Sequence, residues 1–391
     1  MRGAEVIAPG IEVLLSDSLH LVRGKRVGLI TNHTARDRDG RSSVDLLFSA
    51  PGVRLTALFG PEHGIRGVAE GGARIASAVD SATGVPIFSL YGETRVPTAA
   101  MLADVDVLLY DIQDVGARSY TYVWTMALAA ERTQKLGKQF IVLDRPNPIR
   151  DDRIEGGMLE LRHRSFVGLY RVPLRYGLTP AELLRFLIGS GQLSAGTSAS
   201  VVPMRGYRRS MWLDETGMSW VSPSPNIRDL ETALLYPGTV FFEATNVSEG
   251  RGTDEPLKLV GAPWMTDAPA IARVLNAMHM PGVRFDTTTR TIARGEKFGG
   301  RTIPMIAVRV TDRDAIRPVE VGVRLMRAIR ARHPQQWRWR SNGIEELSGS
   351  RRLRAAIESP KATAVDRLLA TWRSESAQFT RDVSRYRLYP E

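Results

Sequence analysis

Short apolar runs that end in polar residues alternate with amphipathic segments through the first half of the chain. Five such runs predict strands, at residues 26–31, 54–59, 85–90, 105–110 and 140–143. Helical periodicity predicts helices at residues 43–49, 122–136 and 179–190, the last with Thr before Pro at its start. Strands that alternate with helices are typical of βα units, so we expect an α/β fold with a Rossmann-like, doubly wound, mainly parallel sheet.

The pattern changes after Tyr236-Pro237-Gly238. Longer strand-like runs follow at 239–244, 283–288 and 303–311, with helices near 268–278, 319–332 and 364–381. We therefore expect a Rossmann-like domain over residues 1–238 and a smaller α+β domain over 239–391. No low-complexity linker separates them, which favours two domains that pack together.

Composition and charge exclude several classes of function. With 391 residues and no Cys, the chain suits two or three domains without disulfides, thiolate nucleophiles or zinc–thiolate sites. Of the net charge of +11, +9 lies in residues 301–391, and the first 300 residues are nearly balanced. This distribution argues against a nucleic-acid partner.

Targeting signals are also missing from the pattern. No apolar run approaches the ~20 residues that span a bilayer, so we expect no membrane partner. The first residues lack a signal-peptide core, which predicts a cytoplasmic protein as written, and a periplasmic or secreted one if a leader has been removed.

Polar side chains follow four of the five predicted strands. In an open parallel sheet, ligands bind outside the carboxyl ends of the strands, so these positions should share one rim. They are Asn32 and His33, Glu62 and His63, Asp111, Gln113 and Asp114, and Asp144, Arg145 and Asn147.

Glu62 lies between Pro61 and His63, in a loop with glycines at both ends. Such a loop can hold a carboxylate rigidly beside a ligand, so Glu62 and His63 are candidates for acid–base chemistry. The alternative is a turn whose glutamate caps a helix or pairs with an arginine. Asp111 and Asp114 are open to the same two interpretations, because Asp after a buried strand often caps the next helix.

Two later loops add candidate binding residues. Residues 222–226 (Ser-Pro-Ser-Pro-Asn) form a stretch stiffened by proline, and residues 246–253 form a polar loop punctuated by glycine. The candidates in these loops are Ser224, Asn226, Asn246, Glu249, Arg251 and Thr253.

Motifs for metals and nucleotides are not found. No HExxH or comparable ligand spacing occurs, so His33 and His63 are expected to form hydrogen bonds in the site, with no metal. No GxGxxG, GxxxxGK[ST] or GxSxG motif follows a predicted strand. We therefore expect no cofactor.

Seven segments, in order, carry a resemblance that covers essentially the whole chain. They are GLITNHT, FGPEHGIRG, DIQDVGARSYTY, LDRPNP, VSPSPNI, LLYPGTVFFEATNVSEGRGT and GAPW. In these segments the chain resembles the NamZ-type exo-β-N-acetylmuramidases, formerly a domain of unknown function. The resemblance implies a Rossmann-like domain, a smaller C-terminal domain and a site in the cleft between them. It also implies hydrolytic release of non-reducing terminal N-acetylmuramic acid (MurNAc) from peptidoglycan fragments, during cell-wall turnover and recycling.

The resemblance also suggests roles. The family's proposed catalytic glutamate maps onto Glu62, which would act as the acid at the leaving oxygen. Asp111 or Asp114 would activate water or attack, or the substrate's acetamido group would assist. A carboxyl separation of ~5 Å predicts retention and ~6.5–9.5 Å predicts inversion. The lactyl carboxylate of MurNAc calls for a placed arginine, for which Arg251 is preferred over Arg118 and Arg145. Tyr120, in the same motif as Arg118, joins the substrate-binding candidates.

Two alternatives remain open at this point. One is a catalytically inactive protein that binds muropeptides or other carbohydrates. The other is a nucleotide-dependent oxidoreductase or transferase, which the missing phosphate loop disfavours. The oligomeric state is left open.

Overall fold

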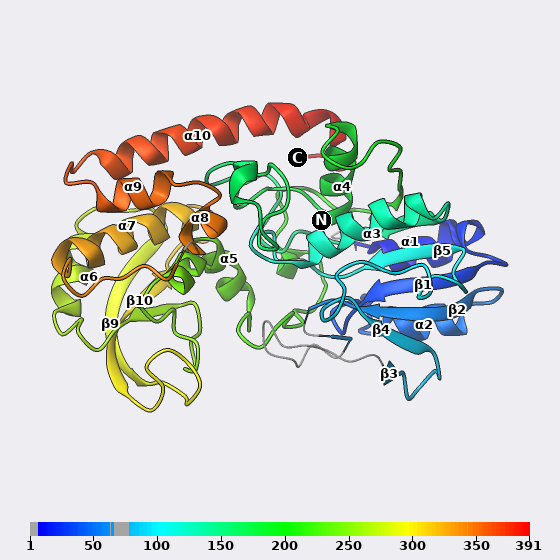
Figure 1. Cartoon of the computed structure of the whole chain (residues 1–391), viewed down its shortest axis with the longest axis horizontal. Coiled ribbons are helices and arrows are strands. Elements are labelled where there is room, and N and C mark those ends of the chain that lie inside the picture. The colour runs from blue at the N-terminus through cyan, green and yellow to red at the C-terminus, as the bar shows by residue number, and fades with distance from the viewer. Residues whose placement is uncertain (1–6, 63, 66–77, 342) are drawn as a thin grey trace, which may run out of the picture.

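The computed structural model describes residues 7–62, 64–65, 78–341 and 343–391. The chain forms two halves, each built around its own sheet (Figure 1). The long helix α10 (Ala364–Val383) begins on the C-terminal half and runs across to the N-terminal half. Among the described residues, no helix combines the length and apolar character needed to cross a membrane.

The N-terminal half contains a seven-stranded sheet of order β3-β4-β2-β1-β5-β6-β7. All neighbouring strands are parallel except β3 and β4. The strands are β1 (Arg26–Thr31), β2 (Arg54–Gly60), β3 (Ala78–Val79), β4 (Pro86–Ser89), β5 (Val107–Asp111), β6 (Gln139–Leu143) and β7 (Ser200–Val202). The five predicted strands are confirmed. Because β1 pairs with both β2 and β5, the strand order reverses there, where α/β sheets bind ligands.

Four helices belong to this half: α1 (Gly10–Asp17), α2 (Ser43–Ser49), α3 (Tyr122–Lys135) and α4 (Pro180–Gly189). The start predicted for α4 is confirmed, because the Thr179 hydroxyl accepts from the Glu182 amide while the Glu182 carboxylate accepts from the Thr179 amide. Short 3₁₀ turns are η1 (Leu19–Leu21), η2 (Leu161–His163), η3 (Leu213–Glu215), η4 (Val240–Ala244) and η5 (Ser384–Tyr386).

The C-terminal half contains an antiparallel sheet of order β8-β10-β9, with α6 packed against it. Its elements are α5 (Leu230–Thr239), β8 (Leu259–Gly261), α6 (Ala268–Asn276), β9 (Val283–Thr291), β10 (Thr302–Val310), α7 (Pro318–Arg332), α8 (Gly343–Ser348) and α9 (Arg352–Glu358). An α/β half with a smaller α+β half is the predicted fold class, and it is confirmed.

The strand predicted at 239–244 is wrong. Asp229 accepts from the Thr232 amide and starts α5, which continues through Thr239 directly into η4. The run of apolar residues is buried on all sides, and such a run does not distinguish strand from helix. Gly238 lets α5 meet α7 backbone to backbone, because a Cβ there would lie 1.9 Å from the Pro318 oxygen. The expected boundary after residue 238 thus falls inside a helix, and it stays a prediction.

Arg118 joins the two halves. Its guanidinium is fully buried and donates to the Gly157 and Val172 oxygens, at 2.9 and 2.8 Å, in the N-terminal half. It also donates to the Leu347 oxygen, at 2.8 Å, in α8 of the C-terminal half. Gly349 leaves room for it, because a Cβ at Gly349 would lie 2.9 Å from the guanidinium. Arg118 therefore helps to hold α8 against the parallel-sheet half, together with the Glu160 amide, which donates to the Gly349 oxygen at 2.8 Å.

Replacing this guanidinium should weaken the whole fold. Arg118→Met removes three hydrogen bonds from a guanidinium to buried carbonyls, so we expect a loss of roughly 3 kcal/mol or more in unfolding free energy. Urea unfolding followed by tryptophan fluorescence measures this loss. The exposed Arg171 provides the matched control, Arg171→Met, with little expected change. A loss below about 1 kcal/mol in Arg118→Met would contradict the assigned role.

Candidate active site

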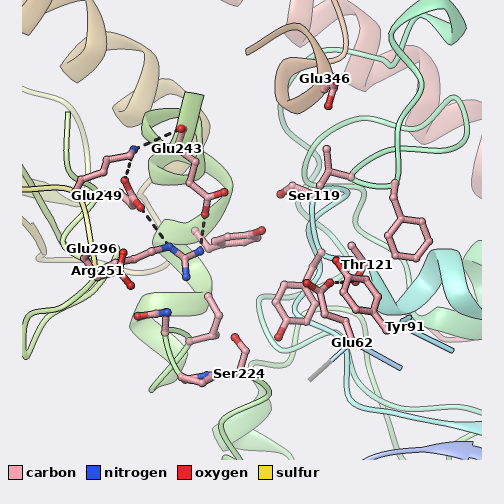
Figure 2. A pocket seen from close by; sticks show the side chains of 18 of the residues that line it. Glu62, Tyr91, Ser119, Thr121, Ser224, Glu243, Glu249, Arg251, Glu296 and Glu346 are labelled. Carbon is pink, nitrogen blue, oxygen red and sulfur yellow. Dashed lines mark hydrogen bonds and ion pairs between the residues drawn. The ribbon is translucent and has the colours of Figure 1, made fainter. Parts of the chain in front are cut away.

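A cavity of about 1250 Å³ opens between the two halves. Figure 2 shows Glu62, Tyr91 and Thr121 on one side of it, and Glu243, Glu249 and Arg251 on the other. The lining residues are Glu62, Tyr91, Arg95, Ser119–Thr121, Ser165–Val167, Ser224–Ile227, Tyr236, Glu243, Glu249, Arg251, Arg294–Lys297, Arg340 and Glu346. Of the predicted site residues, the structure brings Glu62, Tyr120, Ser224, Asn226, Glu249 and Arg251 together here.

Glu62 is held in place by the turn after β2 and by α3. The Gly64 amide donates to the Pro61 oxygen at 2.9 Å, and Gly64 has a φ of 72°, which closes a tight turn around Glu62. The hydroxyl of Thr121, the residue before α3, donates to Glu62 Oε2 at 2.6 Å. The carboxylate is half-buried at the cavity wall. His63 lies outside the described residues.

Tyr91 follows β4 and stands beside Glu62. Burial, together with the neighbouring Glu62 carboxylate, raises the pKa of the Tyr91 hydroxyl to about 12. This hydroxyl therefore stays protonated near neutral pH and can donate. The Arg95 guanidinium lies 4.0 Å from the ring centroid of Phe166, a cation–π distance, on the same wall.

The opposite wall carries a compact ion cluster. Arg251 pairs with Glu243 at 2.5 Å and with Glu249 at 3.2 Å. Lys297 pairs with Glu249 at 2.7 Å and also donates to the Phe242 and Val247 oxygens. Burial opposes the charge on Arg251, but its two carboxylate partners hold its pKa above the usual value. Each cation of the cluster is thus already compensated before any ligand binds.

Aromatic rings and two polar atoms form the floor. The rings of Tyr120 and Tyr236 meet edge to face at 5.9 Å, which offers an apolar surface to a sugar ring. Ser119 Oγ and Tyr120 Oη are buried and make no hydrogen bond of normal geometry among the described residues. Such atoms are suited to a polar ligand, because a buried donor without a partner costs free energy.

Hydrogen bonds from residues outside the cavity lining hold the loop that carries Ser224 and Asn226. His33 Nε2 donates to the Ser222 oxygen at 2.7 Å, and the Ser222 hydroxyl donates to the Ser224 and Ile227 oxygens at 2.8 Å. His33 itself does not line the cavity. The structure thus gives it a supporting position behind the loop.

The structure does not bring Asp111 or Arg145 to the cavity. Both are buried and form an ion pair with each other, with Arg145 Nη2 3.0 Å from Asp111 Oδ2. The Ser43 hydroxyl donates to the same oxygen at 2.5 Å. The strand-end carboxylate therefore points back into the protein, where the guanidinium compensates its charge.

Asp114 also lies beneath the cavity. It accepts from the Tyr176 hydroxyl and, at 2.8 Å, from the Gly116 amide, and burial raises its pKa to about 6. Gln113 donates to the Pro146 oxygen at 2.6 Å, and Asn147 donates to the Leu178 oxygen at 3.3 Å. These side chains fasten the loops after β5 and β6 and do not line the cavity.

Four more predicted residues have structural partners away from the cavity. Asp144 accepts from Thr179 and Tyr389, and Asn32 accepts from Thr34. Asn246 bonds the backbone of residues 336 and 338, and the Thr253 hydroxyl donates to the Gly250 oxygen at 2.6 Å. Arg118 joins the two halves, as described above. In these positions the side chains organise the loops around the cavity.

Several lining residues were missed by the sequence reasoning. Ser119 and Thr121 lie in the same motif as Tyr120, and Tyr91 follows a predicted strand, so the strand-end rule could have found them. Glu243 was assigned to a strand. Arg294, Arg340 and Glu346 carry no local signal, because only the packing of the second half brings them to the cavity. No group of three or more His, Asp or Glu side chains suited to a metal ion occurs in the described part of the chain.

Comparisons with known proteins cover the same two halves. The family model described as "Exo-beta-N-acetylmuramidase NamZ, N-terminal" matches residues 27–231. Its C-terminal counterpart matches residues 234–389. The chain is 40% identical to the peptidoglycan β-N-acetylmuramidase NamZ of Bacillus subtilis (strain 168), across 98% of this chain and 91% of that protein.

Solved structures agree with this relationship. A DUF1343 family protein from Bacteroides fragilis superposes with a TM-score of 0.90 at 37% identity, covering 98% of this chain and 99% of that one. A second DUF1343 family protein from the same organism superposes with a TM-score of 0.77 at 26% identity, with the same coverage. The chain therefore belongs to the NamZ exo-β-N-acetylmuramidase family.

Proposed function

We propose that this protein is an exo-acting glycoside hydrolase that releases non-reducing terminal MurNAc from peptidoglycan fragments, in cell-wall turnover and recycling. The observation that carries this function is the Glu62 carboxyl group, held by Thr121 at the wall of a cavity large enough for a sugar chain. Membership of the family and the curated Bacillus subtilis relative point to the same activity.

The site gives no support to the two alternatives, an inactive carbohydrate-binding protein and a nucleotide-dependent enzyme. An inactive binding protein needs no rigidly held carboxyl group, yet Glu62 is fixed by both a turn and a hydroxyl. A nucleotide-dependent enzyme would need a glycine-rich phosphate loop after β1, where Asn32 and His33 stand. Hydrolysis of a chromogenic MurNAc glycoside without added cofactor or metal tests the hydrolase function directly.

Glu62 is the proposed general acid. Glycoside hydrolysis breaks the bond between the anomeric carbon and the leaving oxygen, and that oxygen takes a proton from a carboxylic acid. Thr121 fixes one oxygen of Glu62, so the orientation of the carboxyl group is set before substrate arrives.

Replacement of the acid should lower kcat/KM most for substrates whose leaving group is poor. In Glu62→Gln we expect kcat/KM for a MurNAc disaccharide to fall by about 10²–10⁴-fold, because the amide has no proton to give. A dinitrophenyl glycoside, which leaves without protonation, should lose distinctly less. Steady-state kinetics on both substrates measures the difference, with Glu93→Gln, an exposed glutamate that does not line the cavity, as control. Equal losses on both substrates would remove Glu62 from the acid role.

The hydroxyl that positions the acid can be tested separately. Thr121→Val removes the 2.6 Å hydrogen bond, and kcat should fall by about ten- to a hundredfold while KM changes little. Thr121→Ser keeps the hydroxyl and should restore most of kcat. If valine and serine behave alike, the hydroxyl does not position Glu62.

The second catalytic group must be sought in the cavity. Asp111 and Asp114 are both engaged in buried contacts away from it, so neither faces a water molecule at the substrate. Two sources remain: another carboxylate of the cavity lining, or the substrate's own acetamido group. Glu243 and Glu249 are neutralised by Arg251 and Lys297.

Among the lining carboxylates, Glu346 fits the second role best. It stands on α8, is half-buried, and makes no hydrogen bond or ion pair within the described ranges. Figure 2 shows Glu346 above Ser119, on the side of the open space that also carries Glu62. A carboxylate in that position can take a proton from the attacking water.

A small nucleophile tests this role. In Glu346→Gln we expect kcat to fall by about 10²–10⁴-fold, and added azide should restore turnover as glycosyl azide, because azide needs no base. Product analysis with and without azide measures this rescue. Near-wild-type kcat in the variant would favour assistance by the acetamido group instead, and loss of activity without azide rescue would assign Glu346 a structural role.

A further inference from the structure

Two arginines of the C-terminal half line the cavity without a charged partner among the described residues. Arg294 lies between β9 and β10, and Arg340 lies shortly before α8. Both side chains are exposed, and within the residues that the structure describes neither guanidinium makes a hydrogen bond or an ion pair. The full donor capacity of both groups is therefore open to a ligand.

The loops that carry them are anchored to one short segment, residues 242–247. The Arg340 amide donates to the Ala244 oxygen at 2.8 Å, and Asn246 bonds the backbone of Arg338 just before it. Lys297, three residues after Arg294, donates to the Phe242 oxygen at 2.8 Å. Both arginines are thus tied to the wall that carries Glu243, opposite Glu62.

The other three cations of the described cavity lining differ in their contacts. Arg251 and Lys297 share the carboxylates of Glu243 and Glu249. Arg95 makes cation–π contacts with Tyr91 and Phe166 and lies on the wall that carries Glu62, away from the other two free guanidinium groups. Arg251, preferred on sequence grounds for an anionic substituent, would have to give up its own partners to bind one.

We propose that Arg294 and Arg340 bind the lactyl carboxylate of the terminal MurNAc. This inference rests on the proposed function, which makes a carboxylate-bearing sugar the substrate. Guanidinium groups bind carboxylates through paired, charge-assisted hydrogen bonds, so two free ones on one wall suit this anion. They also oppose the negative charges of Glu296 and Glu346, which line the same cavity and would otherwise repel the substrate.

This assignment places the acid and the carboxylate-binding pair in different halves of the molecule. The acid Glu62 belongs to the parallel-sheet half, whereas the carboxylate-binding pair belongs to the second half. A glycoside with a neutral substituent would meet the same acid and lose only the contacts to the opposite wall. Discrimination should therefore appear as a preference for the charged substrate over a neutral one of the same shape.

The test compares a chromogenic MurNAc glycoside with its lactamide, in which an amide replaces the carboxylate. For wild type, the ratio of kcat/KM between the two substrates measures recognition of the charge. In Arg294→Gln/Arg340→Gln we expect this ratio to fall by about ten- to a hundredfold. Each single variant should give a ratio between those of wild type and the double variant. Thermal unfolding checks that the variants fold.

Arg301 supplies the matched control, since it is exposed, lies immediately before β10 and does not line the cavity. Arg301→Gln should keep the wild-type ratio. An unchanged ratio in the folded double variant would overturn the proposal, and a fall in the ratio confined to Arg251→Gln would return the role to Arg251. Failure of wild type to hydrolyse either glycoside would refute the proposed function instead.

Calorimetric titration with free MurNAc tests the two arginines without turnover. Equal affinity for MurNAc in wild type and in the double variant would overturn their role.

Discussion

The buried guanidinium of Arg118 is the contact on which the cavity depends. Residue 118 immediately precedes Ser119–Thr121, which line the cavity and include the Thr121 hydroxyl that holds Glu62. The Arg118 guanidinium also reaches the Leu347 oxygen in α8, next to Glu346. Burial lowers its pKa to about 9, and backbone carbonyls from both halves compensate the lost hydration. Because this buried side chain bonds backbone of both halves beside the cavity, it helps to fix their relative position there.

Beneath the cavity, the polar strand ends serve the fold. Asp111 pairs with Arg145, Asp114 accepts from Tyr176, and Asp144 accepts from Tyr389 near the end of the chain. Burial raises the pKa of Asp144 to about 7, which shows how far it is removed from solvent. The strand-end rule thus pointed to the edge of the sheet beside the cavity. After β1, β5 and β6 the first polar residues hold the loops, whereas Glu62 just after β2, and Ser119–Thr121 further along the loop after β5, face the cavity.

The net charge of the chain does not describe the charge of the cavity. The excess of arginine in residues 301–391 accounts for most of the +11. At the cavity, by contrast, the described lining residues include five carboxylates and five cations, so the lining has no formal net charge. Recognition of an anionic sugar then depends on which cations lack partners, because a paired guanidinium contributes little field of its own.

The sequence by itself determined the α/β class, the order of the first-half elements, the family and the loop of Glu62. Alternating apolar runs, a Thr-Pro helix start and ordered motifs are local signals, and the chain obeys them. Only the tertiary structure decided that residues 239–244 are helical, that Asp111 turns inward to Arg145, and that Arg294, Arg340 and Glu346 reach the cavity. The physical reason is that burial and pairing depend on partners far away in the chain. A local pattern shows which residues can carry a charge, but the packed structure decides which charges remain open to a ligand.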